Sequence, residues 1–252
     1  TERRGSVLYY TNKEIFVLSA VGCMDTERDG LESILAGNDE GAKGCCLSVD
    51  MTADGIAVLS SDGYCVAADG TQMNIGEYSY AELHQVAPQL IPAGQAIELA
   101  RTCQAKIAIT VHNQTLLPQL RMTLRHVNYL DDTIFVGLGL VEAARVAVAN
   151  PDLHIMGELP ALPDNIDALV SAAQTTGLFG LRAAPADLTP KLIAACRQAG
   201  LFTMSLPTDN EKSLAMLIHN GVNFIETARP DITAMLLPAG ESEPHQIPLM
   251  RY

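Results

Sequence analysis

The chain is predicted to fold as an α/β protein, a (β/α)8 TIM barrel made by a single domain. Short apolar segments that suit β-strands alternate along the sequence with longer segments that suit helices. Strands that alternate with helices pair in parallel through right-handed crossovers. About eight such units fit into the 252 residues, and this is an ordinary length for such a barrel.

Nine runs rich in β-branched or apolar residues are the expected strands. In chain order they are Glu14–Leu18, Gly44–Val49, Ile56–Leu59, Lys106–Val111, Thr133–Val136, Leu153–Met156, Leu178–Leu181, Leu201–Ser205 and Asn223–Glu226. Helical patterns separate most of them, at Leu31–Glu40, Ala93–Cys103, Thr115–Val127, Val141–Ala149, Asn165–Thr175, Pro190–Ala199 and Asn210–Asn220.

Two of these helices carry clear start signals. Thr189 is a candidate N-cap, and Pro190 follows it at the first helical position, where a missing backbone N–H costs nothing. Asp209 or Asn210 can cap the next helix, and Gly221 is placed to end it. The boundaries of these two helices are therefore predicted from capping chemistry as well as from periodicity.

An open, doubly wound sheet is the structural alternative, because it also alternates strands and helices. The glycine signal for it is the pair Gly137 and Gly139, which follows an expected strand. A dinucleotide-binding loop needs a third glycine, and that position holds Glu142. We interpret the pair as a turn between strand and helix.

One domain over residues 1–252 is the expected organisation, with an N-terminal extension at 1–13 and a short insertion at 62–92 after an early strand. No run of about twenty apolar residues occurs, so no membrane insertion is expected. The first residues lack a signal-peptide pattern, and the chain begins at Thr1. We expect a cytoplasmic protein, or a soluble domain cut from a longer chain.

Charge and cysteine content exclude some classes of partner. The formal net charge is −13, from 16 Lys and Arg against 29 Asp and Glu. Nucleic acids and anionic membrane surfaces are bound by clusters of Lys and Arg, so neither is an expected partner. The six cysteines show no paired spacing, which predicts free, mostly buried thiols in a reducing compartment.

Several segments, taken together, resemble the glycerophosphodiester phosphodiesterase family. Residues Gly41–Gly55 have the frame of its motif G-A-D-x-I-E-L-D-V-x-x-T-x-D-G, and Gly221–Asp231 is similar to G-V-D-G-I-I-T-D-R-P-D. Weaker matches occur at Val17–Gly22, Glu77–Leu83 and Ile91-Pro92, all in the family's order. The resemblance implies a barrel of the phospholipase C-like phosphodiesterase type.

That family, as the resemblance implies, uses two histidines as general acid and base and three carboxylates that bind Ca²⁺ or Mg²⁺. The matching histidine positions here are Ala20 and Ser61. The matching carboxylate positions are Cys46, Ser48 and Thr110, and the family's lysine position is His112. Hard cations require charged oxygen ligands, so no metal cofactor is expected. The chain resembles a member of the family that lacks its catalytic residues.

Polar residues still stand at the expected strand ends, where the site of such a barrel lies. The candidates for ligand binding at the mouth are Ser48, Ser61, Asp62, His112, Glu158, Arg182 and Glu226. Arg182 suits an anion because its fork fits phosphate or carboxylate, but it can equally pair with Glu158 or Glu226 inside the barrel. His112 and Glu158 are candidate bases or ordinary polar neighbours, and Asp62 can instead cap a turn.

Three hypotheses about function follow. The leading one is a glycerophosphodiester phosphodiesterase-like barrel that has lost metal-dependent hydrolysis, a pseudoenzyme that binds a small phosphorylated or anionic ligand or acts as a scaffold. The first alternative is a phosphoric diester hydrolase of lipid metabolism with a site rebuilt from His112, Glu158, Arg182 and Glu226. The second is a homo-oligomeric assembly module. The sequence leaves open whether the chain is an enzyme.

Overall fold

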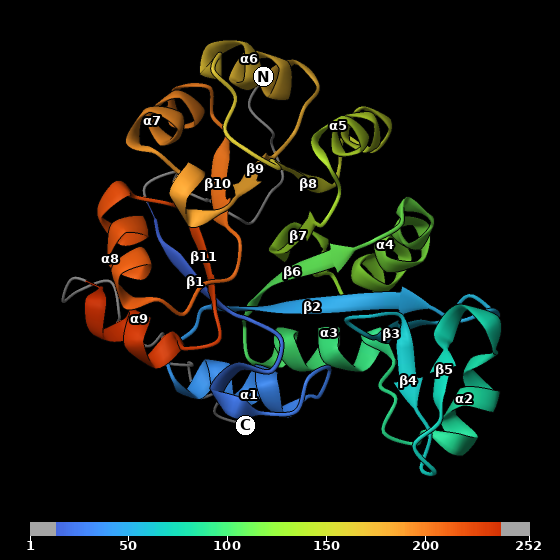
Figure 1. Cartoon of the computed structure of the whole chain (residues 1–252). Helices are drawn as coiled ribbons and strands as arrows, with labels where there is room; N and C mark the ends of the chain where they lie inside the picture. Colours follow the sequence, from blue (N-terminus) through green and yellow to red (C-terminus); the bar gives the residue numbers. More distant parts are fainter. Residues whose placement is uncertain (1–13, 238–252) are drawn as a thin grey trace, which may run out of the picture.

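The computed structural model describes residues 14–237, so the expected extension at 1–13 lies outside the described residues. Eight parallel strands form its centre. They are β1 (Phe16–Ser19), β2 (Gly44–Met51), β6 (Lys106–Val111), β7 (Thr133–Val136), β8 (His154–Glu158), β9 (Gly180–Ala183), β10 (Phe202–Ser205) and β11 (Phe224–Thr227). The sheet closes because β1 pairs with both β11 and β2. The predicted (β/α)8 barrel is confirmed (Figure 1).

Eight helices of the described chain surround this barrel (Figure 1). They are α1 (Glu32–Asp39), α3 (Ala93–Thr102), α4 (Leu117–His126), α5 (Leu140–Ala149), α6 (Ile166–Thr175), α7 (Pro190–Gln198), α8 (Glu211–Asn220) and α9 (Pro230–Leu236). The capping predictions hold: Thr189 Oγ1 accepts from Leu192 N, and Asn210 Oδ1 accepts from Ser213 N. Gly221 ends α8 with φ of 75°, in the left-handed region.

One expected strand has a different role from the one predicted. Residues Ala57–Leu59 form β3, which runs antiparallel to β2 and lies outside the ring of eight. The chain reverses in a tight turn after β2, where Thr52 Oγ1 binds both Asp54 Oδ1 and the Ile56 backbone. Gly55 has φ of 83° there, which favours glycine. A turn this short cannot make a parallel crossover, so β3 forms a hairpin.

Structure that the sequence did not predict fills much of residues 62–92. It comprises the hairpin β4 (Tyr64–Val66) and β5 (Gln72–Asn74), followed by α2 (Tyr80–Val86). A capping box between Ser79 and Glu82 starts α2. This segment extends from one side of the barrel (Figure 1) and has a small apolar cluster, made by Val58, Cys65, Ile75, Leu83, Ala87 and Leu90.

Inward side chains close the amino-terminal end of the barrel. The interior holds Leu18, Cys46, Ala108, Ile134, Val136, Met156, Met204 and Phe224. Phe16 and Phe202, the first residues of β1 and β10, pack against this cluster, as does Phe179 just before β9. The rings of Phe179 and Phe202 stack with centroids 4.5 Å apart, and Phe16 and Phe224 stack at 5.4 Å. Polar inward residues are therefore left for the opposite end, where the strands finish.

The cysteines and helices also bear on two sequence expectations. All six cysteines lie within the described residues as free thiols, and all except Cys103 are buried. None of the helices between residues 14 and 237 has the length and apolar character needed to cross a membrane.

We call the four rings of Phe16, Phe179, Phe202 and Phe224 the aromatic floor, and expect it to contribute strongly to stability. Phe224 is completely buried, and replacing it with alanine should lower the free energy of unfolding by about 3–5 kcal/mol, because the cavity cannot collapse inside a closed sheet. Urea denaturation monitored by circular dichroism measures this change. Met235→Ala is the control, because its side chain is 81% exposed, and should change stability by less than about 0.5 kcal/mol. Equal effects of the two substitutions would contradict the assignment.

Candidate functional site

A cavity of about 360 Å³ opens at the carboxyl ends of the barrel strands. Its lining residues come from strand ends and from the loops that follow them. They are Ala20, Val21, Arg28, Ser48, Ser61, Thr110, Arg182, Pro207, Asp209, Glu226 and Ala228. In barrels of this kind the binding residues lie at this end of the strands. We call this cavity and its walls the mouth.

A buried cluster of three charged side chains lies at the base of the mouth. Arg182 Nη1 donates to Glu158 Oε2 at 2.9 Å, and Arg182 Nη2 donates to Glu226 Oε2 at 2.7 Å. Only 7% of the Arg182 side chain and 8% of the Glu226 side chain are exposed, against 31% for Glu158. The guanidinium therefore has both terminal nitrogens engaged by carboxylates, as the sequence allowed.

Strand register explains how these three residues meet. Glu158 and Arg182 are direct neighbours in the pairing of β8 with β9. The β10 partner of Arg182 is Met204, which is apolar, so the arginine reaches past β10 to Glu226 on β11. Ser205 Oγ accepts from the Glu226 backbone N–H at 3.2 Å and helps to hold the end of β11.

Cys46 adjoins this cluster from β2. Burial raises the pKa of its thiol well above the ordinary value, and the nearby Glu226 carboxylate raises it further. Burial disfavours the charge of Arg182, but the Glu226 carboxylate more than compensates, so the pKa of Arg182 is also raised. The thiol is consequently neutral and poorly nucleophilic, while the guanidinium stays charged.

The structure brings most of the candidate residues to the mouth. Ser48, Ser61, Arg182 and Glu226 line the cavity, and Glu158 joins through its ion pair with Arg182. His112 is exposed at the end of β6, with its Nε2 3.4 Å from Ser48 Oγ.

Asp62 is a candidate that the structure places away from the cavity. Its Oδ1 accepts from the Tyr64 backbone N–H at 3.1 Å in an exposed turn. This is the turn-capping role that the sequence left open as the alternative, and Asp62 is not among the residues that line the cavity.

Two aspartates that the sequence analysis did not select hold the rim of the mouth. Asp29, in the loop between β1 and α1, accepts from Ser61 Oγ at 2.6 Å and from Ser61 N at 3.0 Å. Asp209 Oδ1 accepts from Thr227 Oγ1 at 2.9 Å and from Ala228 N at 2.7 Å. Neither belongs to a motif. The sequence named Asp209 only as a possible helix cap, and Asn210 has that role. The signal for a place at the mouth was the position of Asp209 shortly after the expected strand Leu201–Ser205.

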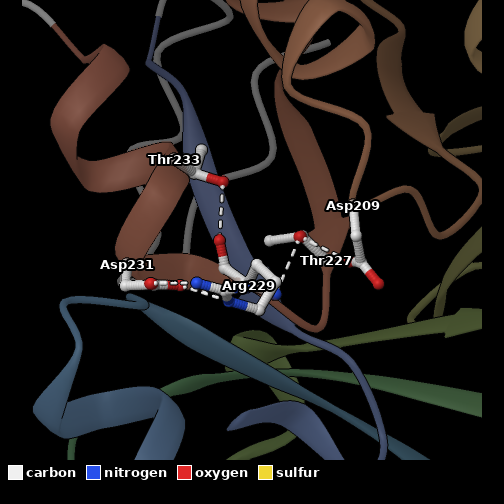
Figure 2. A network of polar contacts seen from close by, with 5 residues as sticks. All are labelled: Asp209, Thr227, Arg229, Asp231 and Thr233. Carbon is white, nitrogen blue, oxygen red and sulfur yellow. Dashed lines mark hydrogen bonds and ion pairs between the residues drawn. The ribbon is translucent and has the colours of Figure 1, made fainter.

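Figure 2 shows how Asp209 is part of a wider network. Thr227 Oγ1 also accepts from the Arg229 backbone N–H at 3.0 Å, and Arg229 binds both oxygens of Asp231 at 3.0 and 2.7 Å. Thr233 Oγ1 donates to the Arg229 carbonyl at 3.3 Å. These contacts tie the loop before α8 to the turn before α9, and so fix Asp209 in the wall of the mouth.

The residues present do not fit a calcium or magnesium ion. Of the three positions that the resemblance assigns to metal ligands, Cys46 is a protonated thiol, and Ser48 and Thr110 are hydroxyls. Such groups are poor ligands for hard cations. The carboxylates Glu158 and Glu226 are already paired with Arg182. Over residues 14–237, no group of three or more His, Cys, Asp or Glu side chains could hold a metal ion.

Comparisons with solved structures agree with the fold. A glycerophosphoryl diester phosphodiesterase from Silicibacter pomeroyi superposes with a TM-score of 0.73 at 16% identity, covering 89% of this chain and 93% of its own. The enzyme from Thermotoga maritima gives 0.75 at 13% identity, with coverage of 89% and 99%. An Oleispira antarctica phosphodiesterase, solved with sn-glycerol-3-phosphate, gives 0.73 at 16% identity, with coverage of 88% and 96%.

No protein-family model matches the sequence, and no curated protein matches it significantly. At identities of 13–16% the structural similarity establishes the fold alone. The chain is thus a (β/α)8 barrel with the architecture of glycerophosphodiester phosphodiesterases. This agrees with the fold that the sequence resemblance implied.

The buried ion cluster should be essential to the stability of the barrel. Arg182→Met leaves Glu226 and Glu158 without their counter-charge and should cost about 3–5 kcal/mol. Adding Glu226→Gln to Arg182→Met should recover much of this loss, because it removes the buried uncompensated charge. Urea denaturation of the two variants and the parent chain measures both effects.

The control for this prediction is Arg229→Met. Its ion pair with Asp231 is exposed, with 46% of the arginine side chain accessible, so the substitution should cost less than about 1 kcal/mol. If Arg182→Met proved as mild as this control, the cluster would not have the structural role assigned to it.

Proposed function

We propose that this chain is a glycerophosphodiester phosphodiesterase-like barrel that binds a small ligand at its mouth and does not carry out metal-dependent hydrolysis. The observation that supports this most directly is the Glu158–Arg182–Glu226 cluster beside Cys46. Glu158 and Glu226, the carboxylates of this cluster, already hold the guanidinium of Arg182. A divalent ion would have to displace a buried arginine, which would lose its partners.

The general acid and base of the family reaction also have no counterpart at the matching positions. Hydrolysis of an anionic diester requires a cation at the phosphoryl oxygens and a pair of groups that move protons. Ala20 cannot transfer a proton, and Ser61 donates its hydroxyl hydrogen to Asp29 at 2.6 Å. Loss of a single acid or base costs about a hundred- to ten-thousand-fold in rate. Loss of both, together with the metal, leaves no route of this type.

A rebuilt hydrolase is the second candidate, and the contact between His112 and Ser48 is the observation that favours it. A serine nucleophile needs a histidine that is itself oriented by a third group. No carboxylate of the described chain is hydrogen-bonded or ion-paired to His112. Glu158 and Glu226 are each already hydrogen-bonded to the guanidinium of Arg182. We therefore rank this candidate below the binding role.

An assembly role is the third candidate. A mouth filled by apolar side chains would favour it, since the barrel would then have no place for a ligand. Instead the aromatic side chains close the opposite end, and the mouth holds an open cavity lined by both polar and apolar residues. This arrangement supports ligand binding at the mouth over a purely structural role.

The hydrolysis test is direct. At high protein concentration, a panel of glycerophosphodiesters with Ca²⁺, with Mg²⁺ or with a chelator should give no turnover above the buffer blank. A metal-dependent enzyme of similar fold, assayed in parallel, shows that the assay works. Turnover abolished by the chelator would contradict the proposal and require a metal site. Turnover that the chelator does not change, and that is lost in the His112→Ala variant, would favour the rebuilt hydrolase.

A further inference from the structure

We infer that the mouth takes a small hydroxylated amine, that is, a ligand with a positive charge and several hydroxyl groups. The inference rests on the proposed binding role and adds the chemical class of the ligand. It follows from three features: the formal charge of the walls, the carboxylate oxygens that remain available, and the hydroxyl groups between them. The volume of about 360 Å³ lies in the range of small-molecule sites, roughly 300–1,000 Å³.

The first feature is an excess of negative charge. Arg28 and Arg182 are the cations that line the cavity, and Glu226 and Asp209 are the carboxylates that line it. Two further carboxylates contact lining residues directly: Glu158 binds Arg182, and Asp29 binds Ser61. Among residues 14–237, two cations thus face four carboxylates, and the whole chain carries a net charge of −13. This balance opposes a phosphate dianion and attracts an ammonium group.

Arg182 does not alter this conclusion, although an arginine suggested an anionic ligand in the sequence. Its two terminal nitrogens both donate to carboxylates at 2.7–2.9 Å. Its Nε is buried and has no hydrogen-bond partner in the described chain, so it presents nothing to the cavity. An anion that approached Arg182 would meet the two carboxylates that already hold its guanidinium, and their negative charges would oppose its binding.

The second feature is unused carboxylate capacity. Thr227 Oγ1 and the Ala228 backbone N–H both donate to Oδ1 of Asp209. The other carboxylate oxygen of Asp209 points away from Thr227 in Figure 2. Glu158 likewise uses Oε2 for Arg182, and 31% of its side chain is exposed. An ammonium group forms charge-assisted hydrogen bonds with such oxygens. No aromatic ring of the described chain lines the cavity, which disfavours quaternary ammonium ions relative to amines that donate hydrogen bonds.

The third feature is the set of hydroxyls. Ser48, Ser61 and Thr110 line the same cavity. Because Ser61 Oγ donates to Asp29, its lone pairs are left to accept from a ligand. Hydroxyl groups on the ligand can both donate to and accept from Ser48 and Thr110. An amine that carries hydroxyl groups can therefore form more hydrogen bonds with the lining residues than an alkyl amine can.

Three sugars of one shape but different charge test the inference: glucosamine, glucose and glucose 6-phosphate. Isothermal titration of the whole chain at slightly acidic pH, where glucosamine is protonated, should give the tightest binding for glucosamine. Glucose should bind at least about ten-fold more weakly, because it lacks the charge-assisted hydrogen bond. Glucose 6-phosphate should bind most weakly of the three. Binding of glucosamine should weaken as salt is added.

Two substitutions locate the binding. Asp209→Asn keeps an oxygen that accepts from Thr227 and Ala228 but removes the charge, and should lower the affinity for glucosamine about ten-fold. Arg28→Gln removes the exposed cation of the rim and should raise that affinity about two- to five-fold. Glu40→Gln is the matched control, since Glu40 is exposed beyond the far end of α1, and should leave the affinity unchanged.

Opposite outcomes would overturn the inference. If glucose 6-phosphate bound best and Arg28→Gln abolished its binding, the mouth would be an anion site. Equal binding of all three sugars, or of none, would also reject a hydroxylated amine as the ligand class, as would an unchanged affinity in Asp209→Asn. None of these results depends on turnover, so failure here is separate from failure of the hydrolysis prediction.

Discussion

The arrangement of the mouth depends on one interaction, the guanidinium of Arg182 held between Glu158 and Glu226. Charges inside an otherwise apolar barrel are tolerated only when they are paired. Arg182 at the end of β9 therefore requires carboxylates on neighbouring strands, and Glu226 requires a cation close by. Burial keeps the nearby Cys46 thiol protonated, and the Glu226 carboxylate adds to this effect. The pairing with Arg182 also occupies one oxygen of Glu158 and one of Glu226.

The aromatic cluster and the open cavity lie at opposite ends of the barrel axis. The amino-terminal end is closed by Phe16, Phe179, Phe202 and Phe224, whose rings stack on one another. The carboxyl end is polar and open. Its rim is held by short-range ties: Ser61 to Asp29, and Thr227 to Asp209. The loop after β1 includes Met24, Asp25 and Asp29 at φ of 53–60°, and Met24 N donates to the Ala228 carbonyl at 2.9 Å. These unusual backbone conformations lie beside the cavity rather than at the floor.

Much of the fold was predictable because it follows from local patterns. All eight barrel strands and seven of the helices were expected within about two residues, since buried parallel strands are short apolar runs and the helices have amphipathic periodicity and caps. The hairpin of β4 and β5 was not expected, because Tyr64, Val66 and Gln72 are exposed and give no clear alternation. The direction of β3 was likewise open, since a short apolar run is the same in a parallel and an antiparallel pair.

The sequence by itself determined the barrel, and it determined that Cys46, Ser48 and Thr110 are not carboxylates. Only the tertiary structure decided what Arg182 does. The sequence allowed an anion-binding arginine or an internal ion pair, and the structure pairs it with residues 24 and 44 positions away. It also brought Asp29 to Ser61 and Asp209 to the end of β11. Such contacts cannot be read from local patterns, because closing the sheet sets which strand ends and loops become neighbours.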